Sequence, residues 1–196
     1  MFATLLHLKK RNMKKIVYLA FLVSVVSLSC DKKDPVIPNE EELITTLSYT
    51  LTPLNGGAAV TMTFTDLDGD GGMTPNVIGG TLAANTIYNG SLSLLNESVS
   101  PADNITTEIL EEGEDHQFFF ETSIGLDAIV DYADFDLNNQ AIGVNSKLET
   151  GGPSQGNLKI TLRHEPNKQA TGVSDGLIAN AGGETDIEII FNVEIK

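Results

Sequence analysis

The chain has 196 residues, of which 27 are acidic and 12 are Lys or Arg, and its formal net charge is −15. Binding to nucleic acid needs Lys and Arg side chains that neutralise phosphates, so this charge excludes nucleic acid as a partner. A chain this acidic attracts cations and basic partners instead.

The N-terminal segment predicts an export signal. From Met13, which we take as the true start, two lysines precede an apolar run from Ile16 to Val26, and small residues follow up to Cys30. This succession of a positive, an apolar and a small-residue region is typical of a signal peptide. The apolar run is much shorter than the roughly 20 residues that span a bilayer. We therefore expect residues 1–29 to be a signal peptide.

Cys30 is the single cysteine of the chain, so it cannot form an internal disulfide. Its place directly after the signal resembles the lipobox of bacterial lipoproteins, with Ser29 at the small position. Stable anchoring needs more than one acyl chain, which a fully processed lipoprotein carries. We predict that Cys30 is lipidated and holds the protein to the outer membrane, on its periplasmic or its cell-surface side. The alternative is a buried structural cysteine after an ordinary signal.

Removal of the signal would make the protein more acidic. Five of the 12 basic residues precede Cys30 and no acidic residue does, so seven basic residues would face 27 acidic ones, a net charge of −20. The next segment, 30–41, contains two prolines and charges of both signs. Such a composition is typical of an extended tether.

From residue 42 onward, apolar and polar residues alternate with a period of two, which predicts strands with one face in a core. Such runs lie at 43–51, 60–65, 92–94, 118–120, 158–162 and 186–195. In the last run, Ile187, Ile189, Phe191, Val193 and Ile195 are expected to face the core, and Asp186, Glu188, Asn192 and Glu194 to face away. One or two helical turns are expected within 101–114. We predict one all-β domain over 42–196, an antiparallel immunoglobulin-like β-sandwich.

The first of two acidic loops is a candidate calcium site, which the second loop could complete. The candidate ligands are Asp66, Asp68 and Asp70 in the first loop and Asp134, Asp136 and Asn138 in the second. Carboxylates two residues apart in a turning loop can converge on one calcium ion, and the first loop matches the first half of an EF-hand loop. Its second half fails, because Val77 stands where an EF-hand needs a bidentate Glu. The alternative is a pair of solvated turns, since Asp and Gly favour turns for conformational reasons.

Two histidines are candidate ligands for a transition metal. His116 has the strand parity of Phe118, and His164 has that of Leu162, so both are expected on the core face at the end of a strand. Imidazole together with nearby carboxylates suits zinc. The alternative is that each histidine makes an ordinary hydrogen bond at the rim of the sandwich.

Several segments together resemble a known family. They are GGAAVTMTFTDLDGDGG, NGSLSLLNES, EEGEDHQFFF, LKITLRHEPNKQATGVSDG and NAGGETDIEIIFNVEI. The set resembles small flavobacterial lipoproteins of the Bacteroidota that are often labelled type 1 periplasmic binding fold superfamily proteins. That label implies two α/β lobes, whereas the alternation here predicts one all-β domain. The resemblance also implies the company of TonB-dependent outer-membrane receptors, and no established activity.

These observations favour a non-catalytic binding module. The motif G-x-S-x-G at 172–176 lacks the later histidine that a hydrolase of that type needs, so no enzyme activity is expected. We expect a lipid-anchored accessory to nutrient or metal uptake, with an outer-membrane receptor as its partner. The alternative is a structural or adhesive module of the envelope whose loops calcium makes rigid.

Overall fold

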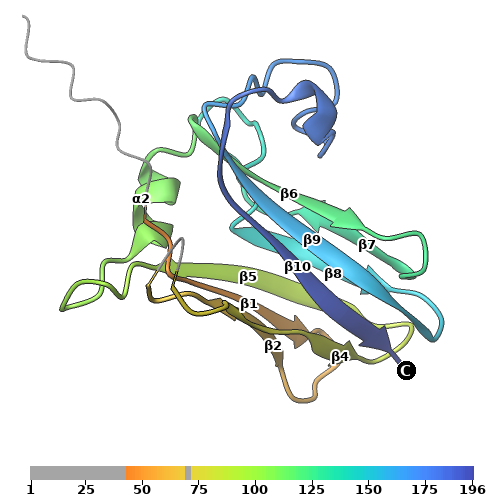
Figure 1. Cartoon of the computed structure of the whole chain (residues 1–196). Helices are drawn as coiled ribbons and strands as arrows, with labels where there is room; N and C mark the ends of the chain where they lie inside the picture. Colours follow the sequence, from red (N-terminus) through yellow and green to blue (C-terminus); the bar gives the residue numbers. More distant parts are fainter. Residues whose placement is uncertain (1–42, 69–71) are drawn as a thin grey trace, which may run out of the picture. The chain divides into compact units, whose positions relative to one another are not determined.

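The strands form where the sequence alternates, and they build two sheets (Figure 1). The structure, a computed structural model, describes residues 43–68 and 72–196. Its elements are β1 (Thr46–Pro53), β2 (Val60–Thr65), β3 (Asn76–Ile78), β4 (Gly80–Leu82), β5 (Ile87–Leu95), α2 (Ile105–Glu111), β6 (His116–Thr122), β7 (Ala128–Tyr132), β8 (Asn145–Thr150), β9 (Ser154–His164), η1 (Ile178–Asn180) and β10 (Glu184–Ile195). The predicted signal peptide (1–29), the tether with Cys30 (30–41) and Asp70 lie outside the described residues.

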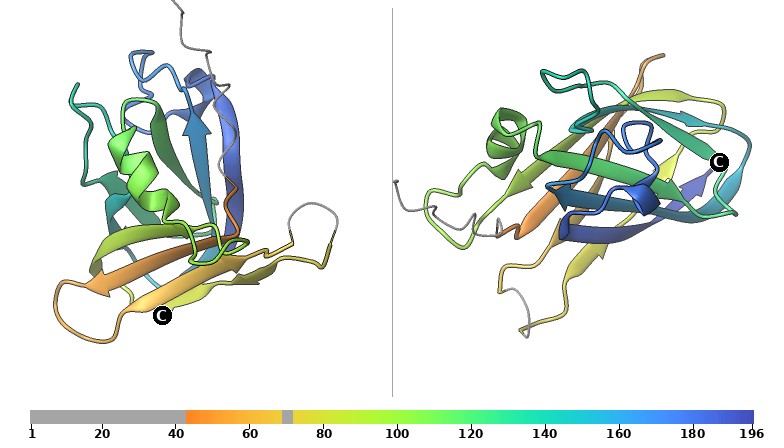
Figure 2. Two further views of the ribbon diagram at one scale, coloured as in Figure 1. Left: turned by 90° about the vertical axis from the view of Figure 1, so that its left-hand side faces the viewer. Right: turned by 90° about the horizontal axis from the view of Figure 1, so that it is seen from above.

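The two sheets differ in size. The larger has the strand order β3-β2-β1-β5-β8-β7, and the smaller has the order β4-β10-β9-β6. Among the described strands, β4 and β10 run parallel and the other pairs are antiparallel. Figure 2 shows both sheets from two further directions. The predicted all-β sandwich is confirmed, with one parallel pair that the alternation did not predict.

The core lies between the sheets and consists of the inward residues of the alternating runs. The five apolar residues predicted for the core face of the last strand are all buried. Tyr49 is also buried, and its hydroxyl forms a 2.7 Å hydrogen bond with the Ser146 hydroxyl, so the core contains a satisfied polar pair. Burial raises the pKa of Tyr49 to about 12. Leu43 was expected in the same face as Tyr49, and this is wrong: β1 begins at Thr46 and Leu43 is exposed.

β6 is buried on both faces over its first four residues, which alternation alone does not predict. The loop 165–183, which contains η1, covers its outer face, where Phe119 packs with Val173 and Ala181. The side-chain amide of Gln117 donates a 2.7 Å hydrogen bond to the carbonyl of Val173. The loop therefore adds a small second core to this end of the sandwich.

The helical turns expected within 101–114 are confirmed as α2. Ile105 and Ile109 stand four residues apart, on one helix face, and both are buried. The Thr106 hydroxyl accepts a hydrogen bond from the Leu94 amide at 2.7 Å, which fastens the helix to β5. Figure 1 places α2 and the loop with η1 at the end of the sheets opposite the C-terminus. Within the part of the chain that the structure describes, neither helix has the length and apolar character to span a bilayer.

Four strands, β3, β4, β7 and β8, lie outside the alternating runs predicted from the sequence. In β7 and β8 the reason is that inward positions are polar or outward positions are apolar. In β8, the buried residues include Ser146 and Thr150, which hydrogen-bond inside the sandwich. In the edge strand β7, Ile129 is exposed. Asp131 and Tyr132 are the last two residues of β7, so the second acidic loop starts only after Tyr132.

Candidate functional site

The two predicted histidines form a pair at one end of the smaller sheet. His116 is the first residue of β6 and His164 is the last residue of β9, and they lie directly opposite each other in the antiparallel ladder. Their rings are stacked, with centroids 4.8 Å apart and planes that differ by 15°. The structure thus brings together two residues that are 48 positions apart in the sequence.

Asp186 completes a cluster with this histidine pair. The prediction that Asp186 faces away from the core is wrong, because β10 has a bulge between Thr185 and Ile187 in which Asp186 is the extra residue. An extra residue in one strand re-aims its side chain. The side chain of Asp186 is 1 % exposed, and its Oδ1 lies 3.9 Å from Nδ1 of His164. One ligand atom from each of His116, His164 and Asp186 lies within 4.8 Å of the other two.

The backbone after α2 orients the ring of His116. Its Nδ1 lies 3.2 Å from the carbonyl oxygen of Glu112. A carbonyl can only accept, so Nδ1 carries the hydrogen and the lone pair of the neutral ring is on Nε2. Burial lowers the pKa of His116, and the hydrogen bond to Glu112 opposes this effect only in part. The nearby His164 lowers the pKa further, so the neutral ring is the form present at pH 7.

Gly183 allows a close approach of the backbone beside His164. Its φ is +69°, and a Cβ at this position would lie 2.2 Å from the carbonyl oxygen of His164. The neighbouring Gly182 also has a positive φ, of +62°, but a Cβ there would meet open space. Gly183 is therefore the residue that lets β10 begin next to the end of β9.

The second acidic loop is held by donors of the protein itself. Asp134 accepts hydrogen bonds from the amides of Gly143 and Asn145, both at 2.8 Å. Asp136 accepts from the amides of Asn138 at 2.9 Å and Gln140 at 2.8 Å. These two carboxylates therefore stabilise the turn between β7 and β8.

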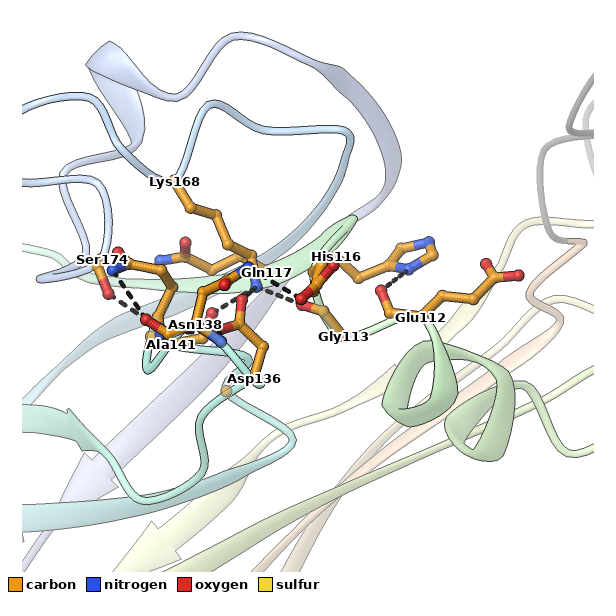
Figure 3. A network of polar contacts seen from close by, with 12 residues as sticks. Glu112, Gly113, His116, Gln117, Asp136, Asn138, Ala141, Lys168 and Ser174 are labelled. Carbon is orange, nitrogen blue, oxygen red and sulfur yellow. Dashed lines mark hydrogen bonds and ion pairs between the residues drawn. The ribbon is translucent and has the colours of Figure 1, made fainter.

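Lys168 ties this loop to two other segments (Figure 3). Its ammonium group donates to the carbonyls of Gly113 and Ala141 and lies 3.1 Å from Oδ2 of Asp136. Burial lowers the pKa of Lys168, and the carboxylate of Asp136 opposes the shift. The side chains of Lys168 and Asp136 are only 5 % and 2 % exposed. The ammonium group thus gives the buried carboxylate of Asp136 a cationic partner from the protein itself.

The first acidic loop is described only in part. Oδ2 of Asp68 accepts a 2.8 Å hydrogen bond from the amide of Met73, which closes the loop. Asp70 lies outside the described residues, so calcium at this loop stays a prediction. Within residues 43–68 and 72–196, the cluster of His116, His164 and Asp186 is the group of three His, Cys, Asp or Glu residues close enough to share a metal ion. The described residues of the two acidic loops do not form such a group.

A pocket of about 320 Å³ lies between the C-terminal end of α2 and the loop after β7. We name it the α2 pocket, and its lining residues are Leu110 to Asp115, Phe135 to Leu137, and Ile142. Leu110 is 44 % exposed, Phe135 is 51 % exposed and Leu137 is 96 % exposed. Four exposed acidic residues, Glu111, Glu112, Glu114 and Asp115, belong to the same wall. The pocket thus combines exposed apolar side chains with a negatively charged wall.

Asp186 and Lys168 are not among the site residues that the sequence predicts. Asp186 looked like any outward residue of an alternating strand, and no local signal marked the bulge. Lys168 looked like a solvated loop lysine, and its burial depends on three segments that meet only in the folded chain. The histidine pair could be found, because strand parity places each ring on the core face.

We predict that Lys168→Met lowers the free energy of unfolding by about 3–5 kcal/mol, since it leaves the buried carboxylate of Asp136 without its cation. The measurement is urea unfolding followed by circular dichroism. The control is Lys159→Met, because Lys159 forms exposed ion pairs with Glu121 and Glu188. Such pairs contribute up to about 1 kcal/mol. Equal losses in the two variants would contradict the role given to Lys168.

The pair Gly182→Ala and Gly183→Ala tests the corner beside His164. Both positions have positive φ, so both substitutions carry a backbone cost of about 1–2 kcal/mol. Only Gly183→Ala also forces a Cβ against the His164 carbonyl, and we expect a further loss of about 1–3 kcal/mol. Urea unfolding measures the difference. A Gly183→Ala variant as stable as Gly182→Ala would show that the close approach is not needed.

Two arrangements at this end of the sandwich can therefore bind: a cluster of two imidazoles and a carboxylate, and an apolar pocket with an acidic wall. In comparisons with known proteins, no family model, no curated protein and no solved structure matches the chain. The predicted place among small flavobacterial lipoproteins stays a prediction.

Proposed function

We propose that this chain is a lipid-anchored protein of the bacterial outer membrane that acts as a non-catalytic binding module. Its partner is a protein of the same membrane, such as a receptor for nutrient or metal uptake, which it contacts through the α2 pocket. The observation that carries the proposal is the combination, in one preformed pocket, of exposed apolar side chains with an acidic wall.

The apolar side chains supply the contact area. Leu137 and Phe135 are exposed on one side of the pocket and Leu110 on the other. Aromatic residues such as Phe135 are enriched at the core of protein interfaces. A few buried residues there provide most of the binding energy. A partner that inserts one apolar side chain between them would cover all three.

The acidic wall determines the charge of that partner. Lys168, which contacts the pocket residues Gly113 and Asp136, is already engaged by that carboxylate and two carbonyls, so the acidic wall keeps a negative charge. A partner segment with Lys or Arg next to an apolar residue complements this surface. Complementary charges accelerate association and exclude acidic competitors.

Hydrogen bonds connect the two sides of the pocket. The side-chain amide of Asn138 donates a 2.9 Å hydrogen bond to Oε1 of Glu114, which joins the two walls. The ammonium group of Lys168 also connects these two segments, because it donates to the carbonyl of Gly113 and to the carboxylate of Asp136. A preformed site loses less conformational entropy on binding than a flexible one.

The alternative proposal is a structural or adhesive module of the envelope. Its loops must be rigid, and the amide contacts of Asp134 and Asp136 favour this function. Calcium bound at Asp66, Asp68 and Asp70 in the first loop would serve this module by making that loop rigid too. Under this alternative, the α2 pocket would have no dedicated partner.

The anchor is tested by Cys30→Ser in cells that process lipoproteins. Because the acyl chains would have no attachment site, we expect the protein to move from the membrane pellet to the soluble fraction and to lose a radioactive palmitate label. The control is Ser29→Ala, which replaces one small residue by another and keeps the cysteine. Membrane retention of the Cys30→Ser variant would rule out the lipid anchor.

The partner contact is tested by a photo-activated crosslinking amino acid placed at Leu137 in intact cells. The control position is Ile124, an equally exposed apolar residue in the turn between β6 and β7, at the opposite end of β6. We expect one defined crosslinked product from position 137 and none from position 124. The double variant Glu111→Lys with Glu112→Lys should reduce the yield, since it reverses the charge of the wall. A product that persists after charge reversal, or equal products at both positions, would contradict the proposed interface.

A further inference from the structure

The cluster of His116, His164 and Asp186 draws its donors from three adjacent strands. β6, β9 and β10 are neighbours in the smaller sheet, and the three residues lie at the same end of it. Strand pairing holds the two histidines opposite each other, and the bulge supplies the carboxylate. The backbone positions of all three ligands are therefore determined by the sheet and not by a loop.

The hydrogen bond at His116 prepares its ring for a metal. With Nδ1 donating to the Glu112 carbonyl, the lone pair of the neutral ring is directed from Nε2. Metal-binding histidines almost always donate their second nitrogen in this way, which sets the tautomer and the ring orientation.

The donor set selects the metal. Two imidazole nitrogens and one carboxylate oxygen suit zinc and similar divalent ions, and this is also the ligand set of many Fe(II) sites. Calcium is disfavoured, because it takes six to eight oxygen ligands. We propose that His116, His164 and Asp186 bind one divalent transition-metal ion of the zinc class.

The site has room to form around the ion and to exchange it. Zinc bonds of about 2.0–2.2 Å separate tetrahedral ligands by roughly 3.3–3.6 Å, so the cluster closes slightly from its present span of up to 4.8 Å. The side chain of His164 is 12 % exposed, which gives the ion a path from solvent. Three protein ligands leave one position for water or for a donor from another molecule.

This inference goes beyond the partner contact at the α2 pocket. The three ligands do not line that pocket, and the link between the two places is the backbone of Glu112. A metal site can therefore exist whether or not the pocket has a partner, and each can be tested without the other.

The test is a titration of the full chain, in detergent and without a polyhistidine tag, with zinc chloride by isothermal calorimetry. Every sample carries Cys30→Ser, so that no thiol competes for zinc. We expect one zinc ion per chain. We expect His164→Ala and Asp186→Asn to weaken binding by more than about 100-fold, since changes to outer-shell contacts alone cost 10–100-fold.

Two matched variants serve as controls. Glu188→Gln and Glu194→Gln each remove an exposed carboxylate of β10, two and eight residues along the strand from Asp186. Both should bind zinc like the parent. The absence of stoichiometric zinc binding, or equal losses in the ligand and control variants, would overturn the proposal.

X-ray absorption at the zinc edge keeps the proposal testable where a ligand variant does not fold. In the parent protein, we expect two imidazole nitrogens at about 2.0–2.1 Å. A shell of oxygen atoms alone, or displacement of zinc by calcium, would place the ion in the acidic loops and would overturn the inference. The crosslinking experiment at Leu137 has a separate readout, so failure of one proposal does not imply failure of the other.

Discussion

The end of the sandwich that carries the α2 pocket and the histidine pair depends on one buried ammonium group. Lys168, from the loop after β9, binds the carbonyl of Gly113 after α2, the carbonyl of Ala141 and the carboxylate of Asp136. An unpaired charge in such a place costs several kcal/mol, so burial of the lysine keeps all three segments together. Gly113 directly follows Glu112, whose carbonyl accepts the hydrogen bond of His116. The same contact therefore supports both the α2 pocket and the histidine pair.

Strand pairing and one irregularity in it bring together the three side chains of the proposed metal site. Regular pairing places His116 opposite His164, but it would direct Asp186 away from them. The bulge in β10 changes the direction of a single side chain and leaves the alternation that follows it intact, since Ile187 to Ile195 continue to fill the core. Gly183 permits the corner that precedes the bulge. A site built in this way is as rigid as the sheet that carries it, which is what tight and selective metal binding needs.

Charge links the proposed partner contact and the proposed metal site. The domain carries a large excess of acidic residues. Among the described residues, the one buried Lys or Arg is Lys168, and its ammonium group is already paired with Asp136 inside the protein. A surface with this field concentrates divalent cations and basic segments near it. A lipid-anchored module that attracts both would suit a place beside an uptake receptor. The acidic pocket and the His–Asp cluster would then recognise two different ligands at one end of the sandwich.

The fold class follows from the amino-acid pattern alone, because strict alternation in β1, β2, β9 and β10 leaves a two-sided core as the way to bury one face of each strand. The pattern also determined which face His116 and His164 occupy. Edge strands such as β7, and the polar inward residues of β8, could not be found, since neither follows the alternation. The position of Asp186 beside the histidines and the burial of Lys168 can be seen only in the folded chain. The reason is physical: a bulge and a buried ion pair depend on contacts between segments far apart in the chain, which no local pattern encodes.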